Sequence, residues 1–218
     1  MRKKLVLIIC TLMLMSISTF AQTHYILEGG YALSANYATA IGMRQPMNGA
    51  QIGFAFDYRF KSFPAIGIKT GVGYRFVCYI STRNQFVAPD IQLTEDAQTQ
   101  ESILDHSIFL PIRMSVNFDI KDWTLKFLTG PKANYHFESS QFNYNDKTGH
   151  YEGKSNFDVV YMPFDCTWGV GFGTHYKHLY LETMIDFGLF NRTRQNNPTY
   201  ELNTVSSREF YVTVGYAF

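Results

Sequence analysis

Long apolar runs are scarce in this sequence of 218 residues. After the first 20 residues, no apolar stretch approaches the ~20 residues that a membrane-spanning helix needs. This absence excludes a membrane protein built from several spanning helices.

Cysteine and excess basic charge are also scarce. Only Cys78 and Cys166 lie beyond the first stretch, and both fall on the face that we expect to meet lipid. They are therefore interpreted as small hydrophobic residues rather than as a disulfide. The 19 lysines and arginines barely exceed the 18 acidic residues, so the charge gives no argument for nucleic acid as a partner.

The N-terminal segment has the features of a cleavable signal peptide. A basic segment at residues 2–4 precedes an uncharged, mostly apolar run at residues 5–20, and small residues stand at positions −3 and −1 from a cut after Ala21. We therefore expect residues 1–21 to be a signal peptide and residues 22–218 to form one domain, within the usual size range.

Alternation of apolar and polar residues dominates the rest of the chain. In residues 51–60 every even position is large and apolar, whereas the odd positions are Gln, Gly, Ala, Asp and Arg. A period of two predicts a β-strand. The pattern predicts about eight strands, at residues 25–36, 51–60, 66–80, 108–120, 123–137, 164–176, 179–190 and 208–218. Several reach the ~9–11 residues that cross a bilayer at a tilt, and an even number is typical of outer-membrane barrels.

The composition of the polar face indicates which side of the barrel is wet. A soluble, lipocalin-like barrel would show the same alternation with its apolar side inward. Glycines are frequent among the charges of the polar face, which suits a narrow lumen where small residues leave room for long ones. They are Gly53, Gly67, Gly71, Gly73, Gly169, Gly171, Gly173 and Gly215. We therefore predict a membrane barrel with its polar face inward.

Twelve charged residues of both signs are expected to form a lumen charge network. Buried charges at this density must pair or stay hydrated. The twelve are Glu28, Asp57, Arg59, Lys69, Arg75, Arg113, Lys126, Lys132, Asp165, Glu182, Asp186 and Glu209.

The connections alternate between short and long, as expected when one end of a barrel faces the periplasm and the other the exterior. Residues 61–64, 121–122 and 177–178 are short connections, and residues 37–49, 81–105, 138–160 and 191–207 are long, polar ones. The short end gathers aromatic residues that suit an interfacial girdle. They are Phe60, Phe63, Trp123, Tyr176 and Phe218.

The last strand carries an apolar row that ends on the terminal phenylalanine. The row is Phe210, Val212, Val214, Tyr216 and Phe218. It resembles the C-terminal β-signal that the outer-membrane barrel assembly machinery binds by strand addition. We therefore predict this machinery as a partner during biogenesis.

Several short motifs together resemble the porin-family outer-membrane β-barrel domain, which includes PorT-like proteins and small OmpX-like barrels. They are Leu110-Pro111-Ile112-Arg113-Met114, Leu128-Thr129-Gly130-Pro131-Lys132, Phe164-Asp165 before Gly169-Val170-Gly171-Phe172-Gly173, Leu179-Tyr180-Leu181-Glu182 with Phe187-Gly188-Leu189, and residues 211–218. The resemblance covers essentially all of residues 22–218. It implies a single antiparallel, up-and-down transmembrane barrel in the bacterial outer membrane, surrounded by outer-membrane lipids. PorT-like members are associated with secretion of other proteins.

Catalysis and metal binding are not expected. His106 and Ser107, with Glu101 and Asp105 close in sequence, have the residue types of a Ser/His/acid set. Adjacent residues of a strand point to opposite faces, however, so His106 and Ser107 should not meet.

The other histidines give no recognisable ligand spacing. His136 and His150 are interpreted as solvated loop or rim residues, and His175 and His178 flank a turn without a third metal-type partner. No catalytic, cofactor or metal site is predicted.

A structural or interaction role remains as the predicted function. The interior of an eight-stranded barrel is just wide enough for side chains to fill it, so we expect a filled lumen and a scaffold that displays long external loops. The alternatives are a PorT-like accessory component of protein secretion with a secretion-system or surface protein as partner, a narrow porin for small solutes, and a lipid A-modifying enzyme. A small-ion path through Asp165, Glu182 and Asp186 is a further alternative.

Overall fold

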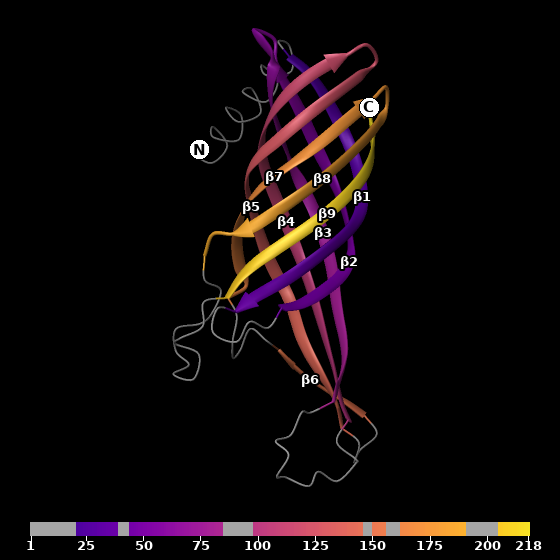
Figure 1. The fold of residues 1–218 in the computed structure, drawn as a ribbon, viewed down its shortest axis with the longest axis vertical. Helices are drawn as coiled ribbons and strands as arrows, with labels where there is room; N and C mark the ends of the chain where they lie inside the picture. Colours follow the sequence, from indigo (N-terminus) through magenta and orange to yellow (C-terminus); the bar gives the residue numbers. More distant parts are fainter. Residues whose placement is uncertain (1–20, 39–43, 85–97, 146–149, 156–161, 191–204) are drawn as a thin grey trace, which may run out of the picture.

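The computed structural model of the protein describes residues 21–38, 44–84, 98–145, 150–155, 162–190 and 205–218. These residues form nine antiparallel strands (Figure 1). The strands are β1 (Ala21–Ala38), β2 (Arg44–Phe60), β3 (Phe63–Asn84), β4 (Gln98–Ile120), β5 (Trp123–Asn145), β6 (His150–Ser155), β7 (Phe164–Tyr176), β8 (Leu179–Gly188) and β9 (Val205–Ala217). Within these ranges no helix has the length and hydropathy of a membrane span. The predicted signal peptide lies outside the described residues except for Ala21, where β1 begins.

Eight of the strands close into a barrel. Each pairs antiparallel with its neighbours in the order β4-β3-β2-β1-β9-β8-β7-β5, and the pairing of β4 with β5 completes the ring. The first and last barrel strands meet through a continuous register from Ile26 with Ala217 to Ala38 with Val205. The predicted all-β antiparallel barrel of about eight strands is therefore confirmed, and β6 is an additional short strand outside the ring.

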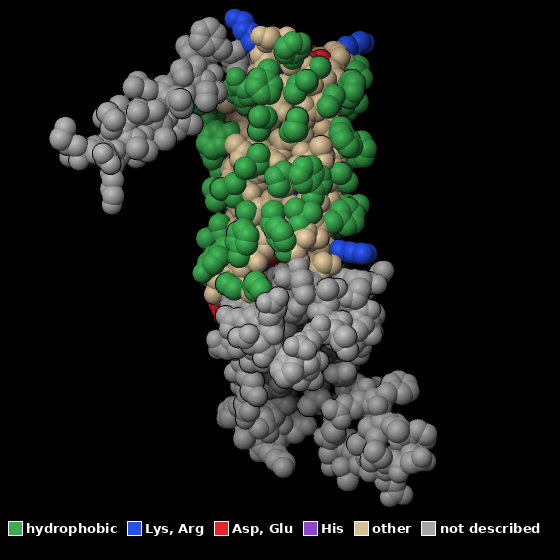
Figure 2. All heavy atoms as spheres, turned by 90° about the vertical axis from the view of Figure 1, so that its left-hand side faces the viewer, with side chains coloured by type: hydrophobic (Ala, Val, Ile, Leu, Met, Phe, Trp, Pro, Cys, Tyr) green, Lys and Arg blue, Asp and Glu red, His purple; other side chains and the backbone are tan. Residues whose placement is uncertain are grey.

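Side chains alternate between the two surfaces of the barrel. Along β7, residues alternate strictly between buried and more exposed positions. Phe172, for example, is 65% exposed, whereas its neighbours Gly171 and Gly173 are buried. In the view of Figure 2, hydrophobic side chains cover the wall of the barrel, and lysine and arginine side chains appear only near its two ends.

Glycines on the inward face make room for long side chains. A Cβ atom at Gly73 would lie 2.1 Å from Cζ of Phe109, so the Phe109 ring occupies the space that a larger residue would need. A Cβ atom at Gly169 would lie within 3 Å of Asp186 Oδ1 and Arg113 Nη1. These glycines therefore allow bulky and charged residues to share a narrow interior.

Two-residue turns define one end of the barrel, called the turn end below. Lys61-Ser62 joins β2 to β3, Lys121-Asp122 joins β4 to β5, and Lys177-His178 joins β7 to β8. Lys121 and Lys177 have φ values of 54° and 52°, as the first position of a primed hairpin turn requires. The chain's C-terminus lies at the same end (Figure 1), where the backbone N–H of Phe218 donates to the carbonyl of Tyr25 over 2.8 Å.

At the opposite end, which we call the loop end, the strands are longer than the sequence predicts. Residues 81–84 and 98–105 were expected in a loop but continue β3 and β4, and residues 138–145 and 150–155 form the end of β5 and all of β6. Residues 37–38, 44–49 and 205–207 likewise belong to β1, β2 and β9. The predicted loop boundaries were wrong here because only backbone pairing, without apolar alternation, marks these segments.

These extensions form a four-stranded sheet that projects past the barrel (Figure 1). It consists of residues 79–84 of β3, 98–104 of β4, 138–145 of β5, and β6. We call this element the projecting sheet.

Candidate functional site: a charged lumen and a projecting sheet

All twelve residues of the predicted lumen charge network are buried on the inward face of the barrel. Each of the six basic members has a carboxylate oxygen within 4 Å. The pairs form successive layers from the turn end to the loop end.

The layer nearest the turn end contains two pairs. Arg59 Nη1 lies 3.0 Å from Asp119 Oδ1, and Asp119 also accepts a 2.6 Å hydrogen bond from Thr124. Lys126 is paired with Asp57, and both side chains are almost fully buried. Asp119 is half-exposed, so this layer forms the boundary between lumen and solvent.

The middle layer is centred on Lys69. Its Nζ atom lies 2.7 Å from Glu28 Oε2 and 2.7 Å from Glu182 Oε2. Tyr180 donates its hydroxyl hydrogen to Glu182, and its ring lies 4.6 Å from the Lys69 ammonium. One cation therefore bridges two carboxylates from β1 and β8, the two strands that flank β9, and contacts an aromatic face.

The next layer joins three cations to two carboxylates. Asp186 lies 2.7 Å from Arg113 Nη2 and 2.5 Å from Lys132 Nζ. Glu209 is paired with both Lys132 and Arg75. Because Lys132 bridges the two acids, this layer is one connected cluster across the barrel.

Asp165 differs from the other predicted acids. It is fully buried and accepts a hydrogen bond from Ser207, but none of the described cations lies within 4 Å of it. Glu182 and Asp186, the other members of the predicted ion path, are held by Lys69, Arg113 and Lys132.

His136 and Asp105 lie inside the lumen, although the sequence predicts both of them outside it. His136 was interpreted as a solvated rim residue, but it is only 2% exposed and its Nδ1 atom lies 2.7 Å from Asp105 Oδ1. His136 lies an even number of positions from Lys126 and Lys132 on the same strand, so alternation could have placed its side chain inside the barrel as well. Asp105 was assigned to a loop, although it lies an even number of positions from Arg113, as expected for two residues on the same face of a strand.

The Ser/His pair does not form a catalytic arrangement. Ser107 is fully buried on the inward face, whereas His106 lies on the outward face beside the Tyr74 hydroxyl, with 2.5 Å between Tyr74 Oη and His106 Nδ1. A register irregularity between His106 and Ser107 does not bring the two side chains together.

Histidines at the turn end do not form a metal site. The rings of His24 and His175 are 4.9 Å apart in an edge-to-face arrangement, and His178 is stacked on Tyr216. Across the described part of the chain there is no group of three or more His, Cys, Asp or Glu side chains placed to hold a metal ion.

The C-terminal row lies on the outward face of β9. Phe218 is 66% exposed and Val214 is 58% exposed, so the row forms part of the surface that meets lipid. Trp123 and Tyr176 of the predicted girdle are in contact, with ring centroids 4.5 Å apart at the turn end. Cys78 and Cys166 are free thiols at partly exposed positions.

An apolar outer wall, an ion-paired polar interior and a closed antiparallel ring define a small outer-membrane β-barrel. The chain belongs to the family described as outer membrane protein beta-barrel domain, whose model matches residues 20–194. The bacterial outer membrane is therefore its location.

Solved structures with similar folds include further outer-membrane proteins. Ail, the attachment invasion locus protein of Yersinia pestis, is 12% identical with a TM-score of 0.46, and the match covers 90% of this chain and 99% of Ail. Neisserial surface protein A is 12% identical with a TM-score of 0.41, covering 90% and 99%. The outer membrane protease OmpT of Escherichia coli is 10% identical with a TM-score of 0.39, covering 91% and 97%. No curated protein sequence matches significantly.

Proposed function

We propose that the protein is a structural and interaction scaffold whose projecting sheet binds an extended segment of another protein. The observation that carries this proposal is the pairing at the loop end. β3 beyond Cys78 pairs with β4 alone among the described strands, and β6 pairs with β5 alone. The projecting sheet thus has two outer strands whose far edges meet no other described strand.

An edge strand presents backbone N–H and C=O groups that an added strand can satisfy. The projecting sheet continues directly from barrel strands, so the membrane-embedded ring holds its base rigidly. A rigid base lowers the entropy cost of binding, because the edge does not have to be ordered when the partner arrives.

The lumen supports a scaffold rather than a diffusive pore. Arg75, Arg113, Lys126, Lys132 and Tyr180 are among the largest fully buried side chains. Their ion pairs and ring contacts occupy the width of an eight-stranded barrel, which leaves little space for a continuous water path.

Site-specific photo-crosslinking in intact cells tests this proposal. A photoreactive amino acid is placed at Glu152 in β6 and, as a matched control, at Lys121 at the turn end. We expect one defined protein adduct from position 152 and none from position 121. Replacing residues 141–154 with a two-residue turn should abolish binding of that partner while the barrel keeps its heat-modifiable migration on a gel.

The alternatives predict different outcomes. Adducts with secretion components from position 121 and none from position 152 would support the PorT-like role and overturn the scaffold proposal, as would the absence of adducts from both positions. Turnover of lipid A that is lost in His106→Ala would instead identify an enzyme.

A further inference from the structure

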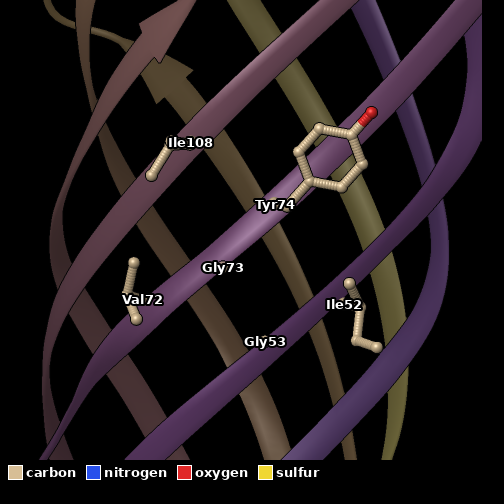
Figure 3. Close-up of a pocket in the computed structure, with 6 residues that line it drawn as sticks. All are labelled: Ile52, Gly53, Val72, Gly73, Tyr74 and Ile108. Atoms are coloured by element: carbon tan, nitrogen blue, oxygen red, sulfur yellow. The ribbon is translucent and has the colours of Figure 1, made fainter.

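A hollow of about 300 Å³ lies in the outer wall of the barrel over β2, β3 and β4. Figure 3 shows the backbone of Gly53 and Gly73 at its floor, with side chains from all three strands around it. The lining residues are Ile52, Gly53, Val72, Gly73, Tyr74 and Ile108. Its volume is at the lower end of the range for ligand pockets, which suits part of one hydrocarbon chain rather than a whole lipid.

The hollow lies beside an interruption in strand pairing. The register of β3 with β4 runs to Thr70 opposite Ile112 and resumes at Gly73 opposite Phe109. Pro111 lies in this gap and has no N–H to donate, while its carbonyl accepts a 2.8 Å hydrogen bond from the Thr70 hydroxyl. Val72, which lines the hollow, lies in the same gap. The depression therefore coincides with the interruption in the pairing of β3 with β4.

The surroundings of the hollow determine what can fill it. Ile52, Val72 and Ile108 are 56%, 53% and 46% exposed on the wall that meets the membrane, so the hollow opens onto lipid hydrocarbon. An apolar void forfeits dispersion contacts, and it offers water no polar partners. Methylene groups are therefore the chemistry that fits it.

A polar pair marks one end of the hollow. The hydroxyl of Tyr74 points away from the other lining residues (Figure 3) and lies 2.5 Å from His106 Nδ1. The His106 ring is in turn 4.9 Å from Phe76 and 6.0 Å from Phe137. Along β4, His106 lies nearer the loop end than Ile108 does, so apolar and polar groups follow one another in the order of a lipid chain and its head group.

We propose that the hollow is a binding seat for one acyl chain of a membrane lipid, with the lipid head group lying against the Tyr74–His106 pair. The proposal concerns the sector of the wall over β2, β3 and β4. It is independent of what the projecting sheet binds.

Photo-labelling in lipid nanodiscs tests the proposed acyl-chain binding site. The probes are phosphatidylcholines with a diazirine either among the first carbons of one acyl chain, called the chain probe, or in the head group, called the head-group probe. We expect the chain probe to label peptides that contain Ile52 and Val72 above all others, and the head-group probe to label the peptide that contains His106.

Two filling variants and a matched control complete the experiment. Val72→Trp and Ile52→Trp should each at least halve labelling of the hollow by the chain probe, because the indole occupies the space of the chain. Val214→Trp, at an outward valine of similar exposure on β9, should leave it unchanged. Heat-modifiable migration verifies that each variant is folded. Labelling spread evenly around the barrel, labelling unaffected by both filling variants, or the reverse order of the two probes would overturn the proposal.

Discussion

At the residue scale, Lys69 illustrates how the lumen is held together. Its ammonium group lies 2.7 Å from carboxylates of two different strands, and its side chain is 3% exposed. Removing one partner of a buried ion pair leaves an uncompensated charge, which costs about 3–5 kcal/mol. Replacing all partners with neutral groups avoids most of that cost.

This reasoning predicts the effect of Lys69→Met. The single substitution should lower the free energy of unfolding by about 3–5 kcal/mol, because Glu28 and Glu182 lose their shared cation. Adding Glu28→Gln and Glu182→Gln to the same chain should recover most of the loss. Urea unfolding of the detergent-folded barrel measures both, and equal stability of the single and triple variants would contradict the bridging role.

At the turn of Lys121 a substitution is expected to raise the free energy of unfolding. Its φ of 54° lies in the left-handed region, which costs a non-glycine residue roughly 1–2 kcal/mol. Lys121→Gly should therefore stabilise the barrel by about 1 kcal/mol.

Asp122→Gly is the control for the turn. The neighbouring Asp122 has no positive φ, so glycine there only adds freedom to the unfolded chain and should be neutral or destabilising. The same urea titration compares the two variants, and a stabilising Asp122→Gly would refute the assigned turn geometry.

The sequence alone indicates on which face of a strand a lumen residue lies, but it does not indicate which residue forms an ion pair with it. A period of two indicates that Lys69 and Glu182 share the polar face. Their hydrogen bond, however, joins positions 113 residues apart in the chain. Which strands oppose each other across the lumen depends on barrel closure and on the register of every pairing, and neither is encoded in local alternation.

At the element scale, the predicted strand boundaries were right where a strand has lipid on one side. They were wrong where a strand has water on both sides. The wall segments of β7 and β8 begin at the predicted residues, because their alternation is strong. Residues 98–104 of β4 lack a sustained apolar row, since no hydrocarbon meets the projecting sheet. Their strand character comes from pairing with β3 and β5, which local sequence does not reveal.

The C-terminal strand carries a prediction about assembly. Phe218 is the end of the outward row on β9, and Phe63 is an almost equally exposed aromatic at the same end of the barrel, 66% against 67%. If the assembly machinery binds the β9 row, Phe218→Ala should lower the folded fraction in outer membranes severalfold, whereas Phe63→Ala should not. Heat-modifiable migration of membrane extracts measures that fraction.

Refolding of the purified chains into detergent separates assembly from stability. Both variants should refold to the same extent there, since the machinery is absent. A similar loss for Phe63→Ala in cells, or a refolding defect confined to Phe218→Ala in detergent, would contradict a targeting role for the terminal residue.

At the scale of the whole molecule, three zones have distinct chemistry. The wall is apolar and meets the membrane, the interior is a stack of ion-paired layers, and the projecting sheet continues from β3, β4 and β5 beyond the ring. Because each lumen cation has a carboxylate partner, the interior can be dense in charge without needing to stay fully hydrated. The proposed interaction site at the loop end and the closed lumen follow from this division into zones.

Conductance across a planar lipid bilayer tests the central claim of a closed scaffold most directly. The chain as it stands should insert without producing steady ionic current. A variant in which all three layers are emptied should conduct; it carries alanine at Glu28, Asp57, Arg59, Lys69, Arg75, Arg113, Lys126, Lys132, Glu182, Asp186 and Glu209. Stable open-channel currents from the unaltered protein, similar to those of the emptied variant, would contradict the account.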